Sequence, residues 1–579
     1  MSPCFVRKRL IVCCDGTWMN SDGSTQVPSN VTRMSRCFSH HCTDGTLQIV
    51  NYQSGVGTGS NALDSVVGGA FGTGIAERIR EAYAFLCTNY SPGDEIILLG
   101  FSRGAFTARS VAGMVASLGL LTAEGLKDFM PIFKDMENWG NKGHKDKSPT
   151  RPFPNKPWPR DPLDRDMVIQ TAREYRKRLE EAGVTQVYYE EPAEAHKTRF
   201  ESSKKLITIK AVAVFDTVGS LGIPQVGWMH RLGFHPSHKE YQFWDTTLSD
   251  RIEHAFQALA LDETRPPFSP AVWEKSEDDE QLCDLRQVWF PGSHSNCGGG
   301  WPDQEIANIS MAWMMDQLAS IGCEFNFDTL DRFLQDSKEY TKNLRVSDRP
   351  KLPPISSQLF DFIKSVGGQA QDYVRPWGCG KIFKKISLFY TLAGTITRSP
   401  GQYRGINPKN GRWKKEYLQN TNERIHSSVR IRLQSRGLGL NDKAVWSCPA
   451  LSGWALERKF HLDVVDPVTT RVAWLPEAWL AEEKETGLVH QMSTENGRWV
   501  WVYHGEKPLS TDTMVEESIG PIEQHLLHFL GSDSWKTLEF ADKVKAEDLV
   551  HPPPQRKHTL RETVTSMWGH VYRMFATPT

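Results

Sequence analysis

The chain has 579 residues, of which 39% are hydrophobic and 24% are charged, and its formal net charge is −1. Such a length exceeds one small core and predicts several domains or one large, elaborated domain. The composition is typical of a soluble globular protein, and the near-zero charge gives no electrostatic basis for binding nucleic acid.

The eleven cysteines are scattered along the chain and form no C-x-x-C pair. Such usage favours reduced thiols in the cytoplasm over a disulfide framework. The first apolar run, Leu10 to Cys14, is too short for the core of a signal peptide. We find no run of the roughly 18 apolar residues that span a bilayer, and we therefore expect a cytoplasmic protein.

Five apolar runs are typical of buried parallel strands, because each is nearly continuous and ends in Gly, Asp, Ser or His. They are residues 9–17, 46–58, 95–104, 206–220 and 285–300. Helical patterns occur at 76–90, directly after Ser102, and at 309–322. This alternation predicts an α/β fold, an α/β-hydrolase-like and mostly parallel sheet flanked by helices. Functional residues are expected beyond the carboxyl ends of the strands.

Two polar insertions interrupt the pattern. Residues 123–205 are rich in Lys, Asp, Pro and Trp, and predict either a cap or lid or a surface excursion. The second insertion spans roughly 324–420. Residues 421–510 contain alternating runs such as SVRIRLQ and RWVWVYHG, which predict a β-rich accessory region. We expect a catalytic domain at 8–325 and an accessory region at 326–579 with a helical tail.

Residues 100–104 read G-F-S-R-G between an apolar strand and a helical run. Strand, sharp turn and helix form the context in which this pattern predicts a nucleophile elbow. Side chains at Gly100 and Gly104 would collide with the neighbouring strand and helix. Ser102 would lie at a helix N-terminus, where N–H groups and the helix dipole favour a developing oxyanion.

A serine nucleophile requires a base and an acid, which follow it in α/β-hydrolases in the order Ser, Asp or Glu, His. Asp216 ends the strand AVAVFD, and His294 ends the strand VWFPGSH before a glycine-rich turn. His294 would take the proton of Ser102, and Asp216 would hold the other ring nitrogen. Three other aspartates compete for the role of the acid: Asp15, Asp262 and Asp303.

The oxyanion hole requires two backbone donors. One is expected to be the N–H of Arg103, the residue after the nucleophile. The other is expected in the loop after the first strand, where Gly16 and Thr17 follow Asp15 and the glycine permits close approach of the backbone.

Other signals predict no cofactor and no metal. The glycine-rich segment 55–74 lacks the endings of a phosphate loop and the spacing of a dinucleotide fingerprint. His230, His235 and His238 cluster, but no pattern fixes them on one face. The C-terminal run TVTSMWGHVYRMF has an apolar helical face that would dock onto the protein's own core or contact a membrane surface.

Five segments carry a family resemblance: CCDGTW, GFSRGAFTAR, VAVFDTVGSLG, AFQALALDE and QVWFPGSHSNCGGG. In this order they resemble the type VI secretion phospholipase-effector-like α/β-hydrolases of bacteria and fungi, over residues 8–325. The later TNERIHSSVRIR resembles the fungal members. The resemblance implies an α/β-hydrolase core that cleaves phospholipid acyl esters. It implies Ser102 as nucleophile and His294 as base, with Asp216 as the acid.

Two residues depart from the family pattern: Asn296 stands where the family usually has Asp, and Gln257 where it has His. The leading hypothesis is a serine esterase or lipase acting on lipid or other small esters. An acyltransferase or thioesterase with the same triad is an alternative, because water and another nucleophile can both deacylate an acyl-enzyme. The third hypothesis is an inactive binding protein that keeps the hydrolase fold.

Overall fold

The structure is a computed structural model of the chain. It describes residues 7–16, 27–55, 71–139, 144–161, 164–190, 204–218, 248–275, 283–343, 377–383, 395–405, 414–435, 437–459, 498–505, 509 and 511–530.

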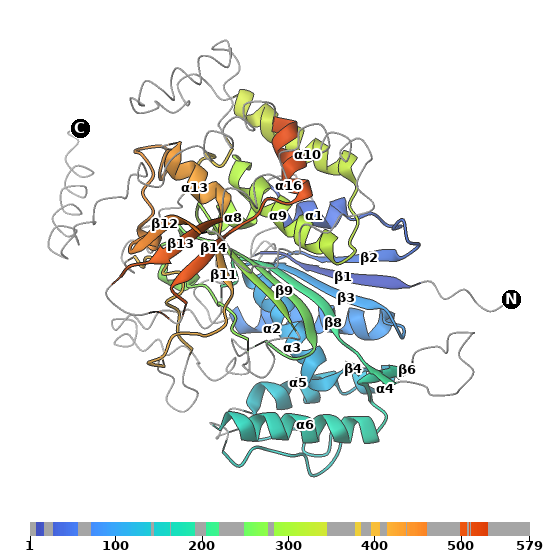
Figure 1. Ribbon diagram of the computed structural model, residues 1–579. Coiled ribbons are helices and arrows are strands. Elements are labelled where there is room, and N and C mark those ends of the chain that lie inside the picture. The colour runs from blue at the N-terminus through green and yellow to red at the C-terminus, as the bar shows by residue number, and fades with distance from the viewer. Residues whose placement is uncertain are drawn as a thin grey trace, which may run out of the picture.

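In the described residues a ten-stranded sheet runs through the centre of the molecule (Figure 1). Its order is β12-β13-β14-β11-β10-β9-β8-β3-β1-β2, and all pairs from β14 to β2 are parallel. The parallel strands are β1 (Lys8–Cys14), β2 (Leu47–Gln53), β3 (Glu95–Phe101), β8 (Ile209–Phe215), β9 (Ile252–Ala260), β10 (Asp284–Phe290), β11 (Glu423–His426) and β14 (Thr513–Glu517). Two antiparallel strands, β13 (Arg498–Tyr503) and β12 (Trp454–Lys459), complete one edge. The predicted α/β class with a mostly parallel sheet is confirmed.

The five predicted strands are β1, β2, β3, β8 and β10, and β9 is an additional strand between β8 and β10. Polar residues interrupt the apolar pattern of β9, which is why the sequence did not reveal it as a strand. Glu253 of β9 forms an ion pair with Lys210 of β8 at 2.8 Å. Gln257 is fully buried and accepts a hydrogen bond from the Thr217 hydroxyl at 2.6 Å. Cross-strand partners therefore replace apolar burial at these positions.

Helices cover both faces of the sheet. Successive residues of β1 point to opposite faces, so Leu10 and Val12 join one apolar core, whereas Ile11 and Cys13 join the other. The first core packs against α2 (Phe71–Asn89) and α3 (Arg103–Leu118). The second packs against α1 (Asn30–Cys37), α9 (Glu305–Ser320), α10 (Phe327–Lys342) and α16 (Pro521–Leu530), which lie together above the sheet in Figure 1. Burial on both faces explains the continuous apolar strands.

The described part of the first insertion contains α4 (Ala123–Leu126), α5 (Phe129–Asn138) and α6 (Arg165–Glu181), with the short pairs β4 (Leu120–Leu121)–β5 (Thr185–Gln186) and β6 (Tyr188–Glu190)–β7 (Lys204–Leu206). It leaves the C-terminal end of α3 and returns at the start of β8 (Figure 1). The Thr185 hydroxyl donates to the Leu118 carbonyl at 2.6 Å, which anchors the insertion at the last turn of α3. The insertion is thus attached at the amino edge of the sheet, and a lid role stays a prediction.

The region after residue 325 extends the same sheet, because β11 pairs with β10 and β14 pairs with β11. Within 421–510 the β-rich expectation agrees with β11, β12 and β13, but it is wrong for SVRIRLQ, which lies in α13 (Ser427–Gln434). His426 caps α13 by accepting a hydrogen bond from the Ser428 N–H at 3.2 Å. The arginines that gave the alternating pattern are buried: Arg430 pairs with Glu516 at 2.8 Å, and Arg432 donates to backbone carbonyls.

Candidate active site

The G-F-S-R-G segment forms a sharp turn between β3 and α3. Ser102 has φ 58° and ψ −121°, in the left-handed half of backbone space that bulky residues avoid. Its N–H donates to the Phe215 carbonyl at 3.1 Å, and its carbonyl accepts from Phe106 at the start of α3. The hydroxyl does not cap the helix. This strained backbone is the geometry expected of a nucleophile elbow.

Both elbow glycines lie in contact with other backbone. A Cβ on Gly100 would lie 2.6 Å from the Cα of Ala105, and a Cβ on Gly104 would overlap the carbonyl oxygen of Cys14. Glycine at position 104 therefore lets α3 pack directly on the end of β1.

We expect Gly104→Ala to lower stability by about 3 kcal/mol or more, because the new methyl group meets rigid backbone. The control is Gly405→Ala, whose new Cβ would meet its nearest neighbour, a Lys414 side-chain carbon, at 3.5 Å. Thermal unfolding midpoints of both variants would check this. Equal midpoints would show that α3 does not need this close approach.

His294 and Asp216 form a close pair. His294 begins α8 (His294–Gly298), and its Nδ1 lies 2.6 Å from Asp216 Oδ2 at the carboxyl end of β8. Both side chains are buried. Asp216 has φ 38°, and the Ala260 N–H donates to its Oδ1 at 3.2 Å. The carboxylate is thereby held toward the imidazole.

An arginine that the sequence did not reveal binds the same carboxylate. Arg398 donates from Nη1 to Asp216 Oδ1 and from Nη2 to Oδ2, both at 3.1 Å. Burial acts to raise the pKa of Asp216, but the charge of Arg398 and the hydrogen bond with His294 outweigh it and lower this pKa to about 2. Asp216 is therefore ionised at every pH near neutrality.

Aromatic rings and a second carboxylate surround His294. The ring of Phe101, next to Ser102 in the chain, lies 4.8 Å from the imidazole between centroids. Phe268 packs edge-on at 4.9 Å. The backbone N–H of His294 donates to Glu263 Oε2 at 3.2 Å. The imidazole Nε2 is buried and has no hydrogen-bond partner among the described residues.

The residues predicted for the oxyanion hole lie beside Ser102 as far as the structure describes them. A Cβ on Gly16 would lie 3.5 Å from the Ser102 Cβ, and Arg103 begins α3. The Gly16 N–H donates to Asp15 Oδ1 at 2.6 Å. Thr17 lies outside the described residues. The oxyanion hole stays a prediction.

Of the four aspartates considered as the acid, Asp216 is the one bonded to the imidazole. Asp15 accepts from the hydroxyls of Ser29, Thr32 and Tyr52. Asp262 accepts from the Gly292 N–H and from the Trp446 indole. Asp303 accepts from the Glu305 and Lys381 N–H groups.

The two departures from the family pattern have structural roles away from the imidazole nitrogens. Gln257 donates to the Ala271 carbonyl at 3.1 Å and to the Gln287 side chain at 3.0 Å. Asn296 Oδ1 accepts from Ser293 and Phe383 N–H groups, and its Nδ2 donates to the Lys381 carbonyl at 2.8 Å. Asn296 thus joins the His294 turn to segment 377–383.

We expect Asn296→Asp to destabilise the protein by about 1–3 kcal/mol at neutral pH, because a carboxylate cannot donate to the Lys381 carbonyl. The loss should shrink as the pH falls and the new carboxyl group becomes protonated and able to donate. Unfolding midpoints of wild type and variant between pH 4 and pH 8 would check this. A constant difference would contradict the donor role.

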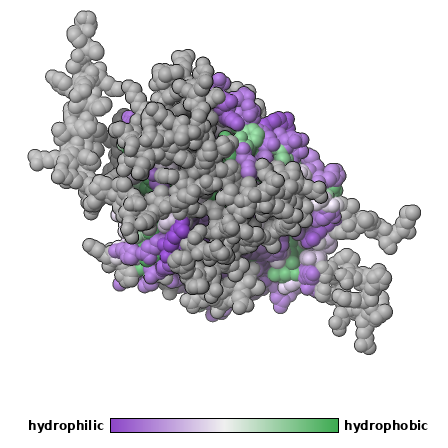
Figure 2. Space-filling model, turned by 45° about the horizontal axis from the view of Figure 1, so that its top comes forward, coloured by the Kyte–Doolittle hydropathy of each residue, from purple (hydrophilic) through white to green (hydrophobic). Residues whose placement is uncertain are grey.

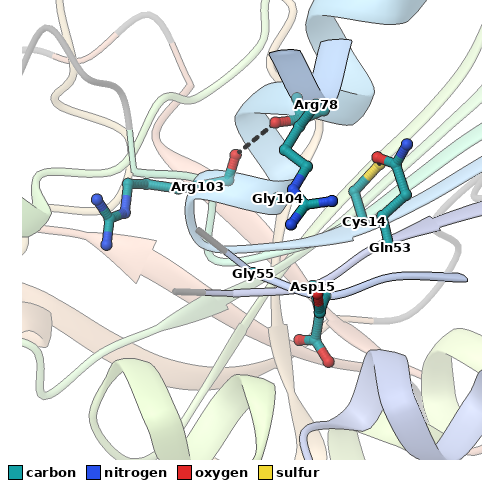
Figure 3. Close-up of a pocket in the computed structure, with 9 residues that line it drawn as sticks. Cys14, Asp15, Gln53, Gly55, Arg78, Arg103 and Gly104 are labelled. Atoms are coloured by element: carbon teal, nitrogen blue, oxygen red, sulfur yellow. Dashed lines mark hydrogen bonds between the residues drawn. The ribbon is translucent and has the colours of Figure 1, made fainter. Parts of the chain in front are cut away.

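A small pocket lies beside the elbow, between the ends of β1 and β2, Arg78 of α2 and the start of α3. Figure 3 shows Arg78 reaching toward the start of α3, whereas the Arg103 guanidinium is directed away from it. The lining residues are Cys14, Asp15, Gln53, Ser54, Gly55, Arg78, Arg103, Gly104 and Thr107. Ser102 and His294 are not among them, so we do not assign this pocket to the reacting part of a substrate.

No site in the described residues suits a resident metal near Ser102. Elsewhere in the described part of the chain, Cys42, Asp44 and Glu324 form one cluster of possible ligands. Its Glu324 carboxylate already accepts from the Thr43 N–H and hydroxyl. The three histidines weighed as a metal cluster, His230, His235 and His238, lie outside the described residues.

On the face that Figure 2 shows, the described residues are mostly hydrophilic, and the hydrophobic spots among them are small and separate. None of the described helices has the length and apolarity required to cross a bilayer. The C-terminal segment proposed to contact a membrane lies outside the described residues.

Sequence reasoning missed Arg398 and Glu263. Arg398 lies 182 residues after its partner Asp216, in a polar insertion, and nothing in the local sequence marks it. Glu263 directly follows Asp262, a weighed rival for the acid, so the acidic pair itself was the available signal.

The catalytic-domain family described as "T6SS, Phospholipase effector Tle1-like" matches residues 8–317. A Saccharomyces cerevisiae protein, "Uncharacterized protein YEL023C", is 26% identical over 298 residues. That alignment covers 49% of this chain and 34% of the relative, so the chain spans about a third of the relative's length. A crystal structure of an uncharacterized protein from Pseudomonas aeruginosa matches with a TM-score of 0.29 and 14% identity, over 56% of this chain and 47% of that chain.

The family match covers more than half of the chain and includes Ser102, Asp216 and His294, whereas Arg398 lies beyond it. The chain belongs to the type VI secretion phospholipase effector Tle1-like family.

Proposed function

We propose that this protein is a serine hydrolase that cleaves the acyl esters of phospholipids or related lipids through an acyl-enzyme. Ser102 is the nucleophile, His294 the general base and Asp216 the orienting acid. The observation that carries the proposal is the 2.6 Å Asp216–His294 pair, whose free Nε2 faces no other described partner beside the strained serine turn.

The chemistry follows from this arrangement. His294 Nε2 accepts the Ser102 hydroxyl proton as Oγ attacks the ester carbonyl, and the imidazolium then protonates the leaving alcohol. Water deacylates Ser102 by the reverse sequence. Asp216, already bonded to Nδ1, fixes the tautomer that leaves Nε2 available as the acceptor. The serine-to-histidine hydrogen bond need not exist before substrate binds, because catalytic hydrogen bonds often shorten in the substrate complex.

The oxyanion is expected at the start of α3, where the Arg103 N–H belongs to the first helical turn. Gly16 is close enough to supply the second donor, provided that its N–H exchanges Asp15 for the substrate oxygen. The helix dipole adds to this stabilisation. We also propose a cytoplasmic location, which the free cysteines of the described residues support.

The direct test incubates purified protein with phosphatidylcholine vesicles and with short-chain soluble esters, and measures fatty acid release. Hydrolysis of both sets supports the proposal, and acyl transfer to an added alcohol without release of free acid would identify an acyltransferase instead. No turnover and no labelling by a fluorophosphonate probe would overturn the proposal and favour a binding protein.

A further inference from the structure

The carboxylate of Asp216 is shared between a base and a cation. In a serine triad the acid stabilises the imidazolium that forms when the serine loses its proton. Here both Asp216 oxygens also accept from Arg398 in a bidentate geometry, at 3.1 Å each. Both side chains are almost completely buried. A bidentate, desolvated guanidinium contact is among the strongest and most directional that a carboxylate makes.

Arg398 also holds a second neighbour of His294. Its Nη2 donates to the Phe268 carbonyl at 2.6 Å, and the Phe268 ring packs edge-on against the imidazole. Its own segment, 395–405, is held by hydrogen bonds of its backbone on both sides of Arg398. The Ile396 N–H donates to the Thr264 carbonyl at 2.9 Å, and the Gly401 N–H donates to Glu423 at 3.0 Å.

We infer that Arg398 is a positioning residue that clamps Asp216 and keeps His294 neutral, and hence competent as a base, at lower pH than an unclamped pair would allow. The inference rests on the proposed function for its activity readout. The cation offsets part of the carboxylate charge that would otherwise favour the imidazolium, and its fork fixes the direction of Oδ2.

The other ionisable groups around the pair do not replace this effect. Glu263, on the backbone side of His294, forms an ion pair with Arg265 at 2.8 Å. Cys297 of α8 is fully buried, and burial raises its pKa well above the usual range, so the thiol stays neutral. Burial likewise raises the pKa of Tyr403, which faces Arg398 and Asp216, to about 12. Arg398 is therefore the cation bonded directly to the acid.

The test measures fluorophosphonate labelling rates from pH 5 to pH 9 for wild type, Arg398→Gln and Arg398→Lys. The acidic midpoint is the pH at which the labelling rate falls to half of its plateau on the acid side. For Arg398→Gln we expect it to rise by about one pH unit, because the positive charge that offsets the Asp216 carboxylate is lost. The plateau rate should fall roughly tenfold to a hundredfold, because the acid is misdirected. Arg398→Lys keeps the charge and should leave the midpoint near wild type, with a reduced plateau.

Arg424→Gln is the matched control. Arg424 pairs with Glu517 at 2.7 Å, is also buried, and joins β11 to β14 away from the imidazole. It should lower stability without moving the acidic midpoint. A folded Arg398→Gln protein with an unchanged midpoint would overturn the inference. If that variant does not fold, a lysine variant with a wild-type plateau would overturn it.

A second readout does not need activity. In the Ser102→Ala background, the ring of ¹⁵N-labelled His294 is titrated by NMR with and without Arg398→Gln. A higher titration midpoint of the His294 ring in the Arg398→Gln protein supports the inference about Arg398. This holds even if the probe never labels wild type, a result that would overturn only the proposed hydrolase activity. Equal titration midpoints with and without Arg398 would overturn the inference.

Discussion

Ser102→Ala is expected to abolish fluorophosphonate labelling and to lower ester hydrolysis by about four to six orders of magnitude, because the triad acts as a unit. The fold should survive, since the Ser102 side chain does not cap α3 and the turn is held by backbone bonds to Phe215 and Phe106. Alanine at this strained φ costs on the order of 1 kcal/mol at most relative to serine, because both carry a Cβ. Active-site labelling followed by mass spectrometry would locate the modified residue.

Ser110→Ala is the matched control for this change. Ser110 lies on α3, the helix that follows Ser102, and is fully buried, but it has no predicted catalytic role. Its variant should be labelled at the wild-type rate. Equal loss of labelling in both variants would mean that α3, rather than the Ser102 hydroxyl, is being tested, and residual wild-type labelling of Ser102→Ala would remove Ser102 as the nucleophile.

Asp216→Asn should have the second-largest effect. Replacing the acid is expected to lower the rate by about 10⁴, because an amide can stabilise the wrong tautomer and carries no charge for the imidazolium. It also leaves Arg398 buried without its carboxylate, which should cost about 3–5 kcal/mol. Labelling rates and unfolding midpoints of the same preparations would separate the two losses.

The pH dependence of this stability loss has a defined sign. The pKa of Asp216 is lowered to about 2, so its contribution to stability is present above the ordinary aspartate pKa and is lost as the pH falls toward 2. The stability difference between wild type and Asp216→Asn should therefore be constant above about pH 5 and narrow below pH 4. A difference that widens on acidification would contradict the ionised, clamped carboxylate.

Asp284→Asn is the control for the aspartate change. Asp284 starts β10 at the amino edge of the sheet and pairs with Arg286 and His254. Although burial opposes it, these partners lower the pKa of Asp284 to about 2 as well. Its loss should reduce stability near neutral pH, with a difference from wild type that narrows in acid as for Asp216→Asn. It should leave labelling unchanged, because Asp284 lies at the opposite end of the strands from Ser102.

Local sequence patterns were sufficient to predict a structural element where all the residues that the element requires lie in one short segment. The elbow needs a buried strand, two glycines and a helix within about twenty residues, and all are contiguous from Glu95 to Leu118. The core strands are continuous apolar runs because both faces are covered. These requirements are met inside single segments and can be recognised without knowing the fold.

Sequence patterns mispredicted secondary structure where a polar residue is buried against a partner from a distant segment. SVRIRLQ alternates like a strand, yet its arginines are buried in α13 because Glu516 and the carbonyls of segment 377–383 receive them. The polar residues of β9 obscured a central strand because their partners lie on β8, β10 and the following loop. In most of these pairs the two members lie 30 or more residues apart, so no short window of sequence contains both.

The sequence by itself determined the parallel α/β core, the sharp serine turn, and a short set of acids and histidines at the ends of strands. Only the tertiary structure decided which aspartate meets His294, what becomes of Asn296 and Gln257, and that Arg398 binds the acid. The physical reason is that strand ends and helix starts follow from local periodicity and backbone sterics. Charge pairing at a buried carboxylate instead depends on which distant segments the fold brings within about 3 Å of it.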